Sequence, residues 1–232
     1  MKKAATHVLM LVLGLVLGVI ILISGVAASR GSLFQETLGL SFGNKAGSIP
    51  ATATPAELVS EAYRIVELIK EEDYKDLANV VHPDNGVVIS PYATITLATN
   101  KRFTPKQVAA FADDAQEYVW GVYNGTGEPI ELTPKEFFSA FVFNKDYTYA
   151  RELGVDYVVK SGNSLENLTE VFPGIRFVDF HIPTDAKSVK GIRGVDGETA
   201  ATDVDWNSLR LGFEEYEGTL RLTVIMHSEW TA

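Results

Sequence analysis

Residues 208–229 read SLRLGFEEYEGTLRLTVIMHSE, and this stretch contains two runs in which apolar and polar side chains alternate. Because successive residues of a strand point to opposite sides, the alternation predicts two antiparallel strands that share one apolar face. All the apolar residues lie on that face only where the numbers of paired residues add to an odd value, as for Phe213 with Leu222. The apolar positions are Leu209, Leu211, Phe213, Leu220, Leu222, Val224 and Met226.

The opposite face of this hairpin carries polar residues from both runs. One register with the predicted pairing sets Ser208 opposite His227 and leaves Arg210 one diagonal step away, within reach of a long side chain. Glu229 supplies a carboxylate on the same face. The alternative is that this face is an ordinary solvated outer surface of the sheet. The predicted ligand-binding site consists of Arg210, Thr223, His227 and Glu229.

Three helix starts precede the hairpin, each marked by the same four-residue pattern. Threonine, proline, a variable residue and then Glu or Gln form a capping box, in which the first and last side chains each accept a backbone N–H. The boxes begin at Thr54, Thr104 and Thr133, and the first helix extends from Pro55 to about Glu71. Helices followed by a sheet with one apolar face predict an α+β fold, with helices packed on a curved antiparallel sheet in a roll.

An uninterrupted apolar run, Val8–Ala28, lies near the N-terminus. It is long enough to cross a bilayer core about 30 Å thick, and the preceding Lys2 and Lys3 predict that the N-terminus stays in the cytoplasm. We expect a single-pass transmembrane anchor in the cell membrane. A cleaved signal peptide is the alternative, because small residues end the run, and a buried soluble helix is the third possibility. The predicted organisation is a cytoplasmic segment 1–7, an anchor 8–28, a linker 29–53 and an extracytoplasmic domain 54–232.

Composition excludes several classes of function. The chain of 232 residues has no cysteine, which excludes disulfides, thiol catalysis and thiolate metal sites. Its formal net charge of -10 argues against binding to nucleic acid, because the phosphate backbone is recognised mainly by basic side chains. No cofactor is expected.

Motifs for metal, nucleotide or serine chemistry are weak or missing in the sequence. Asp203, Asp205, Asn207 and Glu214 match the acidic positions of a calcium loop, but Ser208 replaces its glycine, so we expect an acidic turn and no metal site. No histidine has zinc spacing, the glycines near position 125 lack a phosphate-loop Lys-Ser/Thr, and no serine lies in G-x-S-x-G.

Two histidines leave an enzymatic alternative open. His227 lies two residues before Glu229, and His181 two residues after Asp179, so each pair shares a strand face and could act in acid–base catalysis. The opposing interpretation is a structural histidine with its hydrogen bonds satisfied. A carbohydrate platform is the sharper alternative to a core role for the three tryptophans, Trp120, Trp206 and Trp230.

A family resemblance extends over roughly Leu58–Thr231. The segments that carry it are His82–Tyr92, Trp120–Ile130, and Asp205–Leu211 together with His227–Thr231. They resemble a family of uncharacterised exported proteins of Gram-positive bacteria, often lipoproteins, and the order of the elements is loosely similar to the cystatin-like or NTF2-like roll. The resemblance implies export but no reaction, and this chain departs from it in having no cysteine for lipid attachment.

These observations predict a membrane-anchored, extracytoplasmic binding or interaction module without catalytic activity. Its expected partners are the membrane, through the N-terminal helix, and a small ligand or an envelope protein. One alternative is an enzyme that acts on envelope material through His227 or His181 with a carboxylate. The other is a structural or assembly role through the membrane segment.

Overall fold

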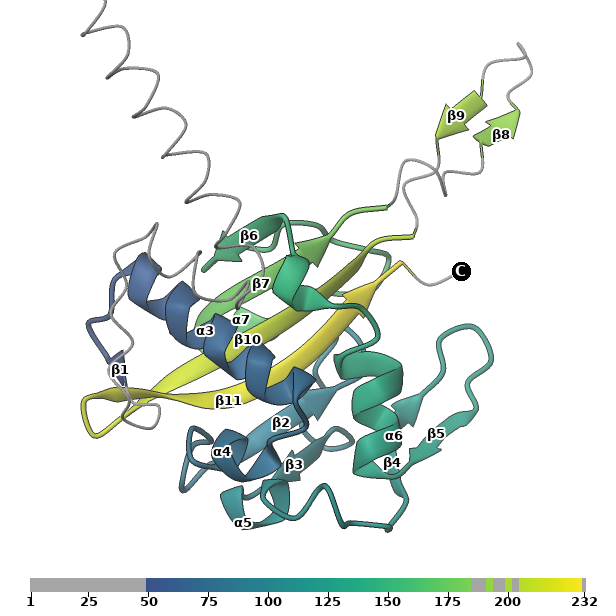
Figure 1. Ribbon diagram of the computed structural model, residues 1–232. Coiled ribbons are helices and arrows are strands. Elements are labelled where there is room, and N and C mark those ends of the chain that lie inside the picture. The colour runs from purple at the N-terminus through teal and green to yellow at the C-terminus, as the bar shows by residue number, and fades with distance from the viewer. Residues whose placement is uncertain (1–48, 185–190, 194–198, 202–204, 231–232) are drawn as a thin grey trace, which may run out of the picture. The chain divides into compact units, whose positions relative to one another are not determined.

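The structure is a computed structural model and describes residues 49–184, 191–193, 199–201 and 205–230 (Figure 1). The helical segments are α3 (Pro55–Lys70), α4 (Tyr74–Ala78), α5 (Pro105–Val108), α6 (Pro134–Phe137), the π-helical turn η2 (Phe138–Val142), the 3-10 turn η3 (Tyr147–Tyr149) and α7 (Leu168–Val171). The strands are β1 (Ile49–Pro50), β2 (Val87–Ser90), β3 (Lys101–Phe103), β4 (Tyr118–Val122), β5 (Pro129–Leu132), β6 (Glu152–Val155), β7 (Arg176–Ile182), β8 (Gly191–Arg193), β9 (Thr199–Ala201), β10 (Asn207–Tyr216) and β11 (Thr219–Glu229).

The main sheet is centred on the hairpin of β10 and β11. Its strand order is β3-β2-β11-β10-β7-β6, and β1 pairs with β11 close to the hairpin turn. The α+β class is confirmed, but the prediction of a wholly antiparallel sheet is wrong, because β2 lies parallel to β11. The domain also begins earlier than the predicted boundary at Thr54, since β1 comes from the segment assigned to the linker. Two smaller hairpins, β4–β5 and β8–β9, lie outside the main sheet.

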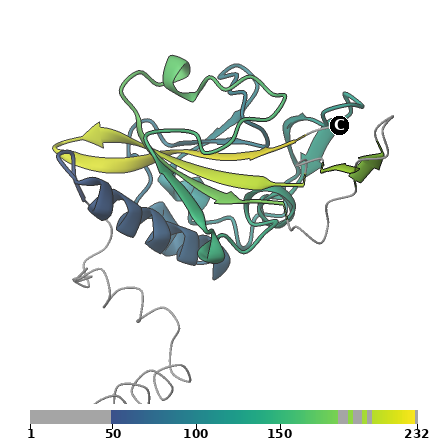
Figure 2. The ribbon, with the colours of Figure 1, turned by 90° about the horizontal axis from the view of Figure 1, so that it is seen from above.

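Both faces of the main sheet are covered (Figure 2). The long helix α3 lies on one face, where its apolar stripe joins the larger core with side chains such as Leu209 and Leu222. A segment that contains α7, residues 156–175, lies over the other face and forms a second, smaller core. That core contains Val88, Ile95, Leu168, Phe172, Ile175, Phe177, Val224 and Met226. The sheet is therefore the middle of three layers, and neither face of the β10–β11 hairpin is open to solvent along its whole length.

The three predicted capping boxes are present. At Thr54, Thr104 and Thr133 the threonine side chain accepts from the backbone N–H three residues on, and the Glu or Gln side chain accepts from the threonine N–H. Each pair of bonds satisfies amides that the first helical turn would leave unpaired, which typically stabilises a helix by about 1 kcal/mol. Only the first box starts a long helix. After Thr104 and Thr133 the α-helical segment ends within two turns.

The predicted hairpin register holds only near the turn. Phe213 pairs with Leu222 as expected, but the register shifts between Gly212 and Phe213, and Gly212 pairs with Val224. Thr223 is the extra residue of this β-bulge, so every later residue of β11 turns to the other face of the sheet. Gly212 allows the close packing at this point, because a Cβ atom there would lie 2.7 Å from Cδ1 of Ile175 in the covering segment.

The transmembrane helix is not supported as part of the fold. No helix within the described residues is long and apolar enough to cross a membrane. The predicted anchor, Val8–Ala28, lies outside those residues. The fold is therefore an α+β domain with a mixed sheet.

Candidate functional site

The bulge separates the two central residues of the predicted site. Arg210 pairs with Met226 and with Asp179, so its side chain lies under the segment 156–175. His227 pairs with Leu209, so its ring lies on the face covered by α3. The prediction that Arg210 and His227 share one face is wrong, because it assumed an unbroken register. Both side chains are buried, so the alternative of a solvated sheet face is wrong for them as well.

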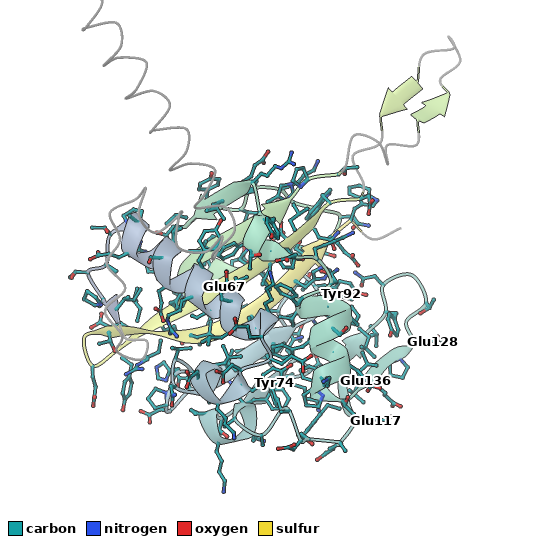
Figure 3. The ribbon with its side chains drawn as sticks, viewed as in Figure 1. Glu67, Tyr74, Tyr92, Glu117, Glu128 and Glu136 are labelled. Atoms are coloured by element: carbon teal, nitrogen blue, oxygen red, sulfur yellow. The ribbon has the colours of Figure 1, made fainter. Side chains whose placement is uncertain are left out.

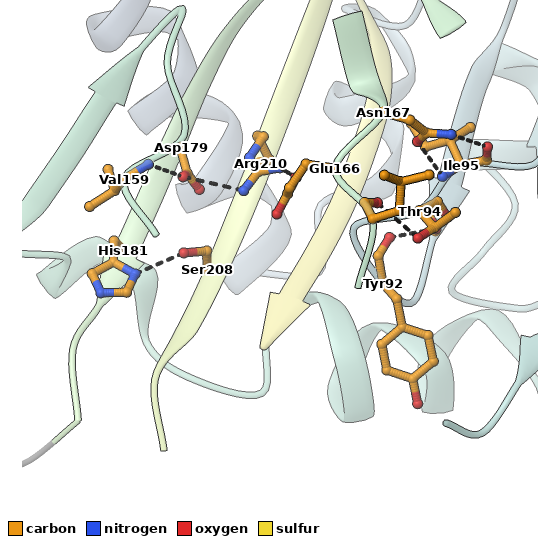
Figure 4. Close-up of polar contacts among 12 residues, drawn as sticks. Tyr92, Thr94, Ile95, Val159, Glu166, Asn167, Asp179, His181, Ser208 and Arg210 are labelled. Carbon is orange, nitrogen blue, oxygen red and sulfur yellow. Dashed lines mark hydrogen bonds and ion pairs between the residues drawn. The ribbon is translucent and has the colours of Figure 1, made fainter. Parts of the chain in front are cut away.

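Arg210 is the centre of a buried ionic cluster (Figure 4). Its Nη1 lies 2.5 Å from Oε2 of Glu166, and its Nη2 lies 3.4 Å from Oδ2 of Asp179. The Val159 N–H also donates to that Asp179 oxygen, at 2.8 Å. Three atoms of the cluster have no hydrogen-bond partner within the described residues: Nε of Arg210, Oδ1 of Asp179 and Oε1 of Glu166. The geometry is that of a buried charge held in place by two ion pairs.

Glu166 belongs to the covering segment, and neighbouring residues fasten that segment to the loop after β2. The Asn167 side chain accepts from the Ile95 N–H at 2.8 Å and donates to the Ile95 carbonyl at 2.9 Å, in the manner of a strand pair. Thr94 donates its hydroxyl to the Leu165 carbonyl at 2.8 Å. These bonds and the Arg210–Glu166 ion pair hold the segment against the sheet, so the role of Arg210 in this cluster is structural.

His181 lies beside this cluster and contacts Ser208. Its Nδ1 is 2.9 Å from the Ser208 hydroxyl, and its ring centroid is 5.5 Å from that of Trp206. Burial lowers the pKa of His181, while the nearby Asp179 charge opposes that shift. Histidine and serine are both buried, so a substrate has no direct path to the hydroxyl. This arrangement counts against the catalytic interpretation of His181.

His227 is held in a second buried network. Its Nδ1 lies 3.0 Å from the Pro91 carbonyl, which only accepts, so Nδ1 carries the proton. Its Nε2 therefore accepts from Asn144 Nδ2 at 3.2 Å, and Asn207 Oδ1 accepts from the same Asn144 nitrogen at 2.8 Å. Burial lowers the pKa of His227 to about 4, so the ring is neutral at neutral pH. With both nitrogens engaged, His227 is a structural histidine and counts against the acid–base alternative.

Glu229 is the predicted residue that remains accessible. It pairs with Asn207 at the end of β11, and its side chain is one-third exposed. Its carboxylate accepts no hydrogen bond from the described residues. One carboxylate oxygen, Oε2, lies 3.9 Å from Nε2 of the neutral His227. Burial raises the pKa of Glu229; Lys145 opposes that shift and Asp205 adds to it. Because it is accessible and accepts no hydrogen bond from the described residues, Glu229 is the predicted residue best placed to contact a ligand.

Aromatic rings from three separate segments lie around this end of the sheet. The Phe141 ring centroid is 6.0 Å from that of Tyr92, 6.2 Å from that of Tyr123 and 6.1 Å from that of His227. Burial, together with the charges of Glu229 and Tyr123, raises the pKa of the Tyr92 phenol. Figure 3 shows Tyr92 close to the helical segment formed by α6 and η2, in agreement with its contact with Phe141. We call Glu229, Tyr92, Tyr123 and Phe141 the Glu229 site.

Sequence reasoning missed the aromatic members of this site. Tyr92 and Tyr123 lie in segments that the sequence marks only by their family resemblance, and no sequence motif singles out Phe141. No local pattern joins these positions, because they come together only when the loop after β2, the β4–β5 hairpin and η2 meet.

The remaining predicted residues have structural roles. Thr223 is the bulge residue, buried, and its hydroxyl donates to the Arg221 carbonyl at 3.2 Å. Trp120 and Trp206 are buried completely, and Trp120 stacks on Phe137 with ring centroids 3.9 Å apart. Trp230 alone of the three is exposed, at 42 %, so a carbohydrate platform of several tryptophans is wrong.

No metal centre is found in the described residues, where no three His, Asp or Glu side chains group to hold an ion. Asp203 of the calcium-loop pattern lies outside those residues, whereas Asp205 and Glu214 lie within them.

Comparison with known proteins gives no assignment. No protein-family model matches the sequence, and no curated protein matches it. Among solved structures, Aln2 from a Streptomyces species overlaps 75% of this chain and 89% of its own, with 9% identity and a TM-score of 0.30. A putative calcium/calmodulin dependent protein kinase II association domain from Xanthomonas campestris overlaps 82% of this chain and 97% of its own, with 9% identity and a TM-score of 0.31. Likenesses this distant support no argument about the fold or the activity of this chain.

Proposed function

We propose that this domain is a binding module without catalytic activity, and that it binds a small ligand at the Glu229 site. The observation that carries the proposal is the Glu229 carboxylate, which is half-buried and accepts no hydrogen bond from the described residues. Its Oε2 lies 3.9 Å from Nε2 of His227, and the His227 ring centroid is 6.1 Å from that of Phe141 in the aromatic cluster. Binding sites for small molecules combine apolar and aromatic walls with a few polar groups that fix orientation. The Glu229 site has both components at an accessible end of the sheet.

The histidines support the non-catalytic part of the proposal. A general acid or base must reach the substrate within hydrogen-bond distance. His227 and His181 are each no more than 2 % exposed and are hydrogen-bonded to protein groups. An acid–base pair of His227 with Glu229 would also need a histidine that is protonated near neutral pH, whereas burial lowers its pKa to about 4.

The test is a ligand screen on the full chain with two matched variants. Glu229→Gln removes the charge at the site, and Glu215→Gln removes one from an exposed position of β10. Melting temperatures are measured against a panel of amines, carboxylates and neutral sugars. We expect one class to raise the melting temperature of the wild type and of Glu215→Gln but not of Glu229→Gln. An equal response in all three proteins, or a response in none of them, would contradict the proposal that a ligand binds at Glu229.

A further inference from the structure

We propose that the ligand of the Glu229 site is an organic cation, presented as a primary or quaternary ammonium group. The inference rests on the proposed function and adds the chemical class of the ligand. It depends on three properties of the site: an uncompensated negative charge, an aromatic cluster that His227 connects to that charge, and too few oxygen ligands for a bare metal ion.

The negative charge of Glu229 has no close counter-ion. Among the described residues, the basic side chain within 4 Å of its carboxylate is His227, and that ring is neutral. Lys145 acts on Glu229 only from beyond the 4 Å of an ion pair, and Asp205 adds a second negative charge to the surroundings. Since a partly desolvated carboxylate is stabilised by any cation that approaches it, the site favours positive ligands and opposes anions.

The aromatic rings select an organic cation over a hydrated one. Tyr92 and Tyr123 flank Phe141, and Tyr123 is 40 % exposed, so the cluster offers ring surface to a molecule at this end of the sheet. Ammonium and alkylammonium groups are attracted to aromatic faces within about 6 Å, and a quaternary ammonium gives up its weak hydration readily. The same rings supply apolar contact to the alkyl groups around the nitrogen.

A bare metal ion is a poorer match. Calcium takes six to eight oxygen ligands, and magnesium needs a nearly octahedral set. Around Glu229, within the described residues, no further carboxylate or histidine completes a group of three that could hold an ion. One carboxylate with aromatic neighbours satisfies an ammonium ion far better than it satisfies either metal.

The site is also separate from the Arg210 cluster. In Figure 4 the Tyr92 ring points away from Arg210, Asp179 and Glu166. Glu229 and Arg210 lie on opposite faces of the hairpin, since Glu229 shares the face of its partner Asn207 and Arg210 shares that of Met226. Arg210 therefore does not neutralise the Glu229 carboxylate or repel a cation bound to it by direct contact.

The experiment is an NMR titration of the full chain with tetramethylammonium chloride, followed by amide shifts around Glu229. Tert-butyl alcohol is the neutral probe of similar size, and sodium chloride and calcium chloride control for ionic strength and inorganic cations. We expect saturable shifts with tetramethylammonium alone. Glu229→Gln should weaken binding by about tenfold, the effect of losing one charged contact, and Glu215→Gln should leave it unchanged. Tyr123→Leu, a change at an exposed ring, should weaken it severalfold.

The outcomes separate this inference from the proposed function. Equal shifts with tetramethylammonium and tert-butyl alcohol, or equal competition by sodium or calcium, would overturn the choice of an organic cation while leaving a ligand site at Glu229. The same holds if a neutral sugar or a carboxylate from the thermal screen binds in a Glu229-dependent way and tetramethylammonium does not. If no probe of any class moves these resonances, both proposals fail.

Discussion

Replacing Arg210 by methionine tests the structural role assigned to the buried ionic cluster. Methionine has a similar length and no charge, so the change removes both ion pairs while keeping much of the volume. Asp179, completely buried, then keeps the Val159 N–H as its hydrogen-bond donor and loses its counter-charge. Breaking one partner out of a buried ion pair costs about 3–5 kcal/mol, because the remaining charge stays desolvated. That is a large part of the roughly 5–15 kcal/mol by which most domains are stable.

The assay is urea unfolding of the full chain, followed by the fluorescence of the buried Trp120 and Trp206. The double variant Arg210→Met with Asp179→Asn removes both charges, and asparagine still accepts from the Val159 N–H. We expect it to be more stable than Arg210→Met alone by about 1–2 kcal/mol, although it carries one more substitution. The exposed Arg151→Met serves as control and should stay within about 0.5 kcal/mol of the wild type.

Two results would refute this reasoning. If Arg210→Met unfolds within about 1 kcal/mol of the wild type, the cluster does not hold the covering segment on the sheet. The single variant Asp179→Asn completes the comparison. If its loss and that of Arg210→Met simply add in the double variant, Arg210 and Asp179 do not interact in the folded state, and the ion pair at 3.4 Å contributes nothing to stability.

Three further predictions concern caps, backbone and pH. Thr104→Ala and Thr133→Ala should each lower the free energy of unfolding by about 1 kcal/mol, measured by urea denaturation, and no change in either would place the helix starts elsewhere. Gly86→Ala should lower the melting temperature by several degrees, because Gly86 has a φ of 66° and an added Cβ would lie 2.4 Å from the Phe103 carbonyl oxygen; Gly127→Ala, with a similar φ and open space around it, is the control for strain without the clash. For His227, the folded pKa of about 4 lies below the unfolded 6.5, so the unfolded chain binds the proton first and stability falls by about 3 kcal/mol as the pH drops from 6.5 to 4. His227→Asn should lack this loss in urea titrations at each pH, and an identical pH dependence in wild type and variant would show that His227 does not titrate as described.

Several features of the fold follow from the local sequence alone. The capping boxes at Thr54, Thr104 and Thr133 are four-residue devices whose hydrogen bonds close within one helical turn, so sequence is enough to place them. The β10–β11 hairpin is equally local, and its first pairs, as far as Phe213 with Leu222, follow from alternation alone. The α+β class follows from the order of these elements.

Tertiary structure decided what the hairpin does beyond the bulge. The sequence pattern predicts a single apolar face. The segment 156–175, however, supplies apolar side chains to the other face, and Val224 and Met226 pack against them in the second core. One extra residue, Thr223, is then enough to exchange the faces of all that follows, because the side-chain period of a strand is two. This exchange places Arg210 and His227 on opposite faces, and it puts His227 and Glu229 on the face where His227 meets a ring cluster from three distant segments. No local pattern contains that information, since it depends on which segments cover each face of the sheet.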